Sequence, residues 1–256
     1  MKKLKIGIIG VGRLGYEHAC NIANRVPGSE LVAIADANFD RAKQVAEELG
    51  VTAVYNDPKD LCADPNVEAV AIITNTASHV EMIKIAMDAG KHVFCEKPLA
   101  DTVEKCKEAE AIIAAHPELT FMLGFMRRYD HSYQVAKKKM ENGDIGDVIL
   151  VRCYSQDPIS IIEGTLEYAP RSGGQFIDMS IHDFDLIRWL TGSEVKELWA
   201  TGGCYEFKQY KDWDDGDNVS GLMKMENDAM AFFFAGRAAA HGSHVETEIV
   251  GTRGTL

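Results

Sequence analysis

The stretch Gly10-Val11-Gly12-Arg13-Leu14-Gly15 constrains the fold of this chain more than any other feature. It follows the β-branched run Leu4 to Ile9 and precedes Tyr16 to Val26, in which apolar residues recur with helical spacing. Glycine triplets with this spacing also occur by chance, so their context decides their meaning. Strand, glycines and helix, followed by a second strand from Leu31 to Ala35, predict a βαβ unit of a parallel sheet.

The three glycines have different physical roles at such a turn. Gly10 permits the tight turn, Gly12 lets the backbone approach a pyrophosphate, and Gly15 lets the helix and the strand pack closely. The amide groups that begin the helix then face the negative charge of the ligand. The segment therefore predicts a dinucleotide site.

The second strand ends on Asp36, 21 residues beyond Gly15. A carboxylate at this spacing accepts hydrogen bonds from the adenosine ribose hydroxyls and repels a 2'-phosphate. No arginine stands at Ala37 or Asn38 to offset that repulsion, which favours NAD over NADP as the cofactor. The alternative is that Asp36 only caps the helix that follows.

Strands and helices alternate along the first half of the chain. Further strands are predicted at residues 53–55, at 69–74, before Glu96 and at 119–125, and helices at 40–49, 80–89 and 101–116, the last with a capping box from Asp101 to Glu104. Strands separated by helices of these lengths need right-handed crossovers between parallel neighbours. Residues 1–125 are therefore predicted to form a doubly wound parallel sheet, the Rossmann type of α/β fold.

The pattern changes after residue 125. One helix is predicted at 133–142, followed by strands without intervening helices at 148–155, 195–205, 219–225, 230–235 and 246–250, with a hairpin around 226–229. This order is typical of an α+β domain built on a mostly antiparallel, open sheet. Residues 126–256 are therefore predicted to be a second domain.

Composition excludes several classes of partner. The formal net charge is -12 and the sequence pI is about 5.1, so nucleic acid and anionic membranes would be repelled. The six cysteines include no C-x-x-C pair, which indicates neither a disulfide framework nor a structural zinc site. The apolar run near the start is interrupted at Arg13 and no small-residue cleavage site follows, so a mature cytoplasmic start is expected.

A second motif, Glu96-Lys97-Pro98, follows the strand-like run that begins at His92. The ring of Pro98 holds the backbone of Lys97 extended, which aims the lysine side chain. At the carboxyl end of a parallel strand, that side chain points into the crevice where α/β sheets bind ligands. The alternative is a surface ion pair beside a helix-starting proline.

The second domain contains the other chemical motif, between Ser172 and Asp185. On one continuous helix, Asp178, His182 and Asp185 would share a face at i, i+4 and i+7. An aspartate one turn before a histidine can hold an imidazole nitrogen and raise its basicity, as a proton-transfer site needs. The alternatives are a structural Asp-His pair and a metal site of these three residues, and we predict no metal.

Together these motifs resemble those of the glucose-fructose oxidoreductase/inositol dehydrogenase/rhizopine-catabolism (Gfo/Idh/MocA) family, and the resemblance covers the whole chain. It is carried by the Gly10-Gly12-Gly15 fingerprint, Glu96-Lys97-Pro98, Gly124 to Tyr129, and Gly173-Gly174 with Asp178 and His182. Within the family, residues 152–158 and Asp217-Asn218 are most similar to bacterial inositol 2-dehydrogenases.

The resemblance implies roles for individual residues. Lys97, Asp178 and His182 would be catalytic and surround the reacting hydroxyl, and these three would bind the substrate together with Arg127. Contacts to NAD would come from Gly10, Gly12, Arg13, Leu14, Asp36, Thr74, Asn75, His79 and Glu96. The resemblance also implies that the second domain binds the substrate and that its open sheet face builds a homotetramer.

The predicted function is oxidation of a secondary hydroxyl of myo- or scyllo-inositol, or of a related cyclic polyol or sugar, to the ketone with NAD. Two alternatives are an NAD-dependent glycoside hydrolase of the same family and a non-catalytic protein that senses NAD or a sugar. The presence of Lys97, Asp178 and His182 together disfavours the sensor. Relatives continue past the position of Leu256, so we expect the second domain to be truncated at its carboxyl end, with a naturally shortened family member as the alternative.

Overall fold

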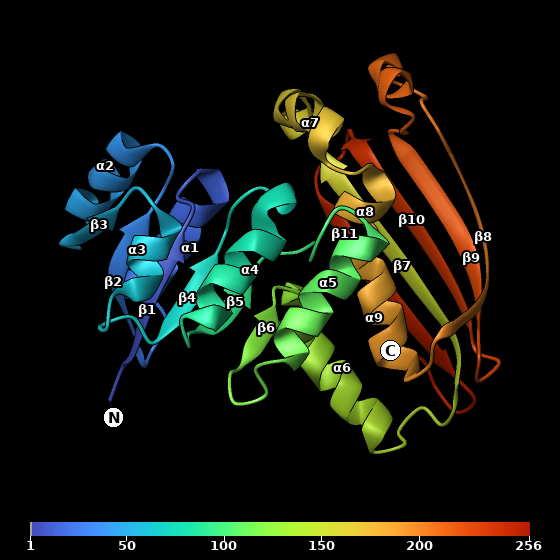
Figure 1. Cartoon of the computed structure of the whole chain (residues 1–256). Coiled ribbons are helices and arrows are strands. Elements are labelled where there is room, and N and C mark those ends of the chain that lie inside the picture. Colours follow the sequence, from blue (N-terminus) through green and yellow to red (C-terminus); the bar gives the residue numbers. More distant parts are fainter. Residues whose placement is uncertain (1) are drawn as a thin grey trace. The chain divides into compact units, whose positions relative to one another are not determined.

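The computed structural model describes residues 2–256. The chain divides into two compact units, Met1–Gly124 and Phe125–Leu256 (Figure 1). The first unit contains a six-stranded sheet and the second a five-stranded sheet, so the predicted α/β architecture with a second α+β domain is confirmed.

All strands of the first sheet are parallel, in the order β3-β2-β1-β4-β5-β6. The strands are β1 (Leu4–Ile9), β2 (Ser29–Ala35), β3 (Ala53–Tyr55), β4 (Ala69–Ile72), β5 (His92–Cys95) and β6 (Phe121–Leu123). The strand order reverses between β1 and β4, and ligands of open α/β sheets bind beyond the carboxyl ends of the strands at such a point. The glycine loop follows β1 and the segment of Thr74 follows β4, so both predicted cofactor segments lie at this position.

Helices cover both faces of the first sheet, as Figure 1 shows. They are α1 (Arg13–Asn24), α2 (Phe39–Leu49), α3 (Pro58–Ala63), α4 (His79–Asp88) and α5 (Val103–Ala114). Neighbouring strand residues point to opposite faces: Ile8 packs in the cluster of α1 and α2, while Ile9 packs in the cluster of α3, α4 and α5. The central strand β4 is therefore buried along its whole length, which explains its unbroken run of hydrophobic residues.

Two helix starts differ from the prediction. The side chain of Thr102 caps α5 by accepting a hydrogen bond from the Lys105 amide at 3.2 Å, so the cap is one residue later than the predicted Asp101. Asp101 instead pairs with the Lys105 ammonium at 3.0 Å. The short helix α3 was not predicted, although its signals are local: Asp57 accepts from the Lys59 amide and Pro58 follows at the first helical position.

The second sheet has the order β11-β7-β10-β9-β8. Its strands are β7 (Val148–Pro158), β8 (Val195–Gly203), β9 (Asn218–Met225), β10 (Met230–Ala239) and β11 (His244–Gly251). Only the β10–β7 pair is parallel among the described strands of this sheet, which confirms the mostly antiparallel prediction. The predicted hairpin around 226–229 joins β9 and β10.

One face of the second sheet is covered and the other is open. The covering helices are α6 (His131–Glu141), α8 (Gln175–Asp178) and α9 (Ile181–Thr191), whereas α7 (Ile162–Tyr168) lies in the connection from β7. At the centre of the core, Phe233 of β10 meets the rings of Phe176 and Phe184 edge to face, at centroid distances of 6.1 and 5.0 Å. None of the helices in the described part of the chain is long and apolar enough to cross a membrane.

Candidate active site

The glycine loop has the geometry that a dinucleotide needs. Gly10 has a φ of 90°, and a Cβ there would press on the carbonyl group of Ile73. A Cβ on Gly15 would overlap the carbonyl oxygen of Gly10, so only glycine fits where α1 meets the loop. At Gly12 a Cβ would meet no described atom within 4 Å, which leaves open space for a ligand against the backbone. The loop therefore fits a bound pyrophosphate.

Asp36 lies at the end of β2 and belongs to the same loop. Its carboxylate accepts the amide of Val11 at 2.7 Å through Oδ2 and the amide of Asn38 at 2.7 Å through Oδ1. The cap of α2 is Asn38, whose side chain accepts from the Arg41 amide at 3.1 Å, so the alternative role of Asp36 as a helix cap is wrong. Contact of Asp36 with a ribose stays a prediction.

The segment after β4 is braced from within the first unit. The buried His79 ring lies with Nδ1 2.8 Å from the Pro98 carbonyl oxygen and with Nε2 3.3 Å from the Thr74 carbonyl oxygen. Burial lowers the pKa of His79, against the opposing effect of these carbonyls, so the neutral ring holds one N–H. His79 thus positions the turn of Lys97 and Pro98, while contacts of Thr74, exposed Asn75 and His79 to a cofactor stay predictions.

Glu96 connects the turn of Lys97 to helix α1. Its Oε1 lies 2.9 Å from Nε2 of His18, and its Oε2 accepts the amide of Lys97 at 3.1 Å. The half-buried Lys97 is therefore supported by its neighbour, and Glu96 by the helix whose exposed first residues are Arg13 and Leu14. The sequence contained no signal for His18, because its contact joins residues 78 positions apart.

The second unit contains the other half of the candidate chemistry, with one correction. The predicted continuous helix is broken: α8 ends at Asp178 and α9 begins at Ile181. At the break the Ser180 amide donates to the Gln175 carbonyl, five residues back, at 3.0 Å, and such a wide turn rotates the following helix face. Asp178 accepts a hydrogen bond from Nη2 of Arg237 at 3.1 Å, a partner that sequence reasoning missed.

The acidic residues of α9 are paired with two consecutive arginines. Arg128 donates to both carboxylate oxygens of Asp185, at 2.7 and 2.8 Å, so Asp185 does not join the predicted polar stripe. Asp183 is fully buried and accepts Arg127 at 2.6 Å and the Ser155 hydroxyl at 2.7 Å, both on Oδ1. Arg127 is therefore a positioning residue in this structure, and its contact with substrate stays a prediction.

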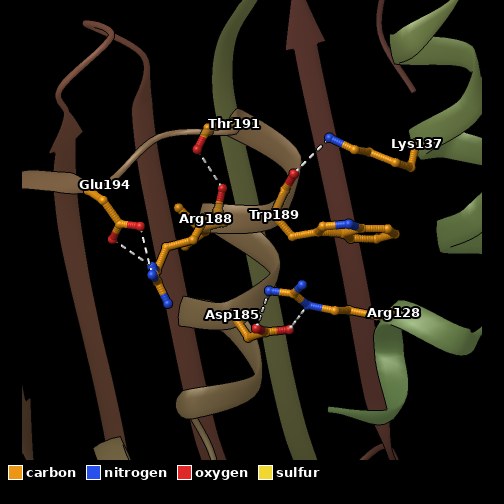
Figure 2. A network of polar contacts seen from close by, with 8 residues as sticks. Arg128, Lys137, Asp185, Arg188, Trp189, Thr191 and Glu194 are labelled. Atoms are coloured by element: carbon orange, nitrogen blue, oxygen red, sulfur yellow. Dashed lines mark hydrogen bonds and ion pairs between the residues drawn. The ribbon is translucent and has the colours of Figure 1, made fainter. Parts of the chain in front are cut away.

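Figure 2 shows the contacts that join α9 to Lys137 of α6 and to Arg128 of the segment before α6. The ammonium of Lys137 from α6 donates to the Trp189 carbonyl at 2.8 Å and lies 5.7 Å from the centre of the indole ring. The guanidinium of Arg128 lies 5.9 Å from the same ring, beside its bidentate contact with Asp185. These contacts hold the backbone that carries His182, whose buried ring meets Phe125 edge to face at 6.4 Å.

Removing the charge of Arg127 is expected to destabilise the second unit strongly. Burial raises the pKa of Asp183, with Arg127 opposing, and Oδ2 of Asp183 has no hydrogen-bond partner among residues 2–256. Arg127→Met would leave this buried carboxylate without its cation and should lower the free energy of unfolding, measured by urea titration, by about 3–5 kcal/mol. The loss should shrink as the pH falls, because Asp183 becomes neutral on protonation. A carboxyl whose pKa is raised in the folded state lowers the free energy of unfolding only at a pH above its pKa in the unfolded chain.

The exposed Arg188–Glu194 pair supplies the matched control for that variant. Arg188→Met should lower the free energy of unfolding by less than about 1 kcal/mol, since exposed ion pairs contribute little to stability. An Arg127→Met protein as stable as the Arg188→Met protein would show that the buried pair does not hold α9.

Comparison with known proteins agrees with this geometry. Residues 4–125 match the family described as "Oxidoreductase family, NAD-binding Rossmann fold", and residues 133–256 match the GFO/IDH/MocA C-terminal domain. The chain belongs to the GFO/IDH/MocA oxidoreductase family. Membership confirms the predicted resemblance, and it confirms that the first domain is an NAD-binding one.

Several members of the GFO/IDH/MocA family are similar along nearly the whole chain. The scyllo-inositol dehydrogenase of Lactobacillus casei, solved with bound NAD(H) and scyllo-inositol, is 42% identical with a TM-score of 0.94, over 100% of this chain and 76% of that one. The myo-inositol 2-dehydrogenase of Thermotoga maritima is 36% identical over 99% of this chain and 74% of its own length. The scyllo-inositol 2-dehydrogenase (NAD(+)) of Bacillus subtilis is 34% identical over 99% of this chain and 73% of its own length.

Proposed function

We propose that the chain is an NAD-dependent dehydrogenase that oxidises one secondary hydroxyl of myo- or scyllo-inositol, or of a related cyclic polyol, to the ketone. The observation that carries the proposal is its similarity, over 100% of its length, to a dehydrogenase whose structure holds both NAD(H) and scyllo-inositol. Lys97, Asp178 and His182 supply the groups that such an oxidation needs.

Each of these three side chains has one task in the proposed reaction. When bound, NAD supplies the acceptor for the hydride. An imidazole nitrogen of His182 takes the proton of the substrate hydroxyl, and Asp178 orients the ring and balances the charge that it gains. The ammonium of Lys97 donates a hydrogen bond to the same oxygen and stabilises the negative charge that develops on it.

Absorbance of NADH, followed with a panel of inositol isomers, aldoses and aryl glycosides, tests the function. Sustained NADH formation with an inositol supports the proposal. Cleavage of an aryl glycoside without net NADH would identify the glycoside hydrolase instead. Binding of NAD and sugar without turnover of any compound would identify a sensor.

Cofactor choice is expected to depend on Asp36. Its carboxylate would repel a 2'-phosphate, so kcat/KM with NAD should exceed that with NADP by at least about tenfold, the equivalent of about 1.4 kcal/mol. Asp36→Ser should narrow the ratio, whereas Asp40→Ser should not, because Asp40 is exposed and pairs with Lys43. Equal efficiency of the unaltered protein with both cofactors would contradict the role of Asp36.

We also infer a cytoplasmic homotetramer built through the open face of the second sheet. All six cysteines are free thiols, which suits a reducing compartment. The open face presents Trp199 and Leu222, which are opposite each other on β8 and β9 and are 63% and 54% exposed. Apolar side chains gathered on one face favour association. Sedimentation of the unaltered protein and of Trp199→Asp should show a tetramer that the variant weakens.

A further inference from the structure

A buried cation contacts Asp178, the proposed partner of the candidate base. Arg237 on β10 is 2% exposed and is the largest of the fully buried side chains. Burying a guanidinium costs free energy unless a carboxylate and hydrogen bonds compensate for the lost water. The partners of Arg237 therefore show what the charge does in this protein.

The carboxylate paired with Arg237 is that of Asp178. Nη2 of Arg237 donates to Oδ2 of Asp178 at 3.1 Å, and the side chain of Asp178 is 18% exposed. A second acid nearby, Asp217, already accepts three backbone amides and the side-chain amide of Asn218. Its carboxylate is thus committed to its own loop. Asp215, a third acid near Tyr210, accepts the amide of Gln175 at 2.9 Å, and the ion pair of Arg237 is with Asp178.

An aromatic residue also packs against the guanidinium. The carbon at its centre lies 5.9 Å from the centre of the fully buried Tyr210 ring. Burial raises the pKa of Tyr210 to about 12, so this phenol is neutral and adds no charge to the pair. Packing of this kind fixes the direction of the guanidinium, and with it the Asp178 carboxylate.

We propose that Arg237 is a positioning residue that orients Asp178 and partly neutralises its charge, and so sets the basicity of His182. The inference rests on the proposed roles of His182 as the base and of Asp178 as the acid that orients it. Sharing the Asp178 carboxylate with a fixed cation weakens its attraction for a protonated imidazole four residues later in the chain. Arg237 would therefore keep His182 able to lose its proton near neutral pH.

The other charged groups packed against α9 do not provide this control. On α9 itself, Asp183 and Asp185 are paired with Arg127 and Arg128 of the segment before α6. From the facing strand β7, burial raises the pKa of Cys153 to about 12, so that thiol is neutral. Arg188, at the far end of α9, pairs with Glu194.

The test is an NMR titration of the His182 ring in the whole chain, which does not depend on the substrate. Arg237→Gln should move the titration midpoint upward by about half a pH unit or more, because Asp178 then acts on the imidazole with its full charge. Asp178→Asn should move it downward. Arg188→Gln, which removes an arginine from the end of the same helix, should leave it unchanged.

Activity supplies a second readout. In Arg237→Gln, the midpoint of the increase of kcat with pH should shift to higher pH by the same amount. The kcat at the plateau should fall about tenfold, while the Kd of NAD stays constant. Arg237→Lys should keep the midpoint of the unaltered protein, because the charge remains, but should lower kcat, because one ammonium cannot reproduce the guanidinium geometry. If Arg237→Gln fails to fold, the kcat and pH profile of Arg237→Lys test the inference instead.

Two results would overturn the inference. One is a folded Arg237→Gln protein with an unchanged His182 midpoint, and the other is an Arg237→Lys protein with the kcat and pH profile of the unaltered chain. Failure of the proposed function is a different outcome: no polyol would be oxidised by the unaltered protein, whatever the titration of His182 in the variants.

Discussion

His182→Ala is expected to lose most of its turnover, by at least about a hundredfold, since general-base catalysis contributes about 10²–10⁴ to such reactions. In the unaltered protein, activity should rise with pH across the neutral range as His182 loses its proton. The variant should lack this rise. Initial rates of NADH formation over a pH series, with saturating NAD and inositol, measure both effects.

Two further variants separate the roles at this site. Asp178→Asn should lower the rate while it preserves the fold, because the ring of His182 loses its orientation or its correct tautomer. His131→Ala, at the exposed start of α6, serves as the control and should behave as the unaltered protein. Near-normal turnover of His182→Ala with an unchanged pH profile would place the base elsewhere, and Lys97 would then be the first candidate.

Lys97→Met is the second variant with a large expected effect. Turnover should fall by about a hundredfold or more, because the ammonium matters most when the hydroxyl oxygen becomes negatively charged. The Kd of NAD, measured by quenching of protein fluorescence, should stay within about twofold. The turn itself should persist, since the Lys97 backbone is held by Glu96 and the Pro98 carbonyl by His79.

The control for Lys97 is Lys105→Met, which removes a partly exposed ammonium from the next helix. Lys97→Met should have the same free energy of unfolding in urea as the unaltered chain. That of Lys105→Met should be lower by less than about 1 kcal/mol, because the Lys105–Asp101 pair is lost. Loss of NAD affinity in proportion to activity, or early unfolding of Lys97→Met, would make Lys97 a structural residue.

Local patterns in the sequence determined the fold class and much of the first unit. The glycine loop, the six strands and the change of pattern after residue 125 depend on backbone sterics and on hydrophobic periodicity, which act over a few residues. The roles of Gly10 and Gly15 followed from the spacing of the glycine motif, and the structure confirms that neither position has room for a Cβ. Asp36 followed from spacing along one βαβ unit.

Tertiary structure alone decided which polar side chains meet. The Arg237–Asp178 pair joins residues 59 positions apart, and the His18–Glu96 contact joins residues 78 apart, so each depends on how strands and helices pack. The break between α8 and α9 and the burial of Arg127 also escaped prediction, because a helical pattern does not reveal a wide turn and an arginine before a helix reads as exposed. Periodicity shows which face of an element is buried, whereas the partner of a buried charge is set by the register of distant strands and by the need to compensate its lost hydration.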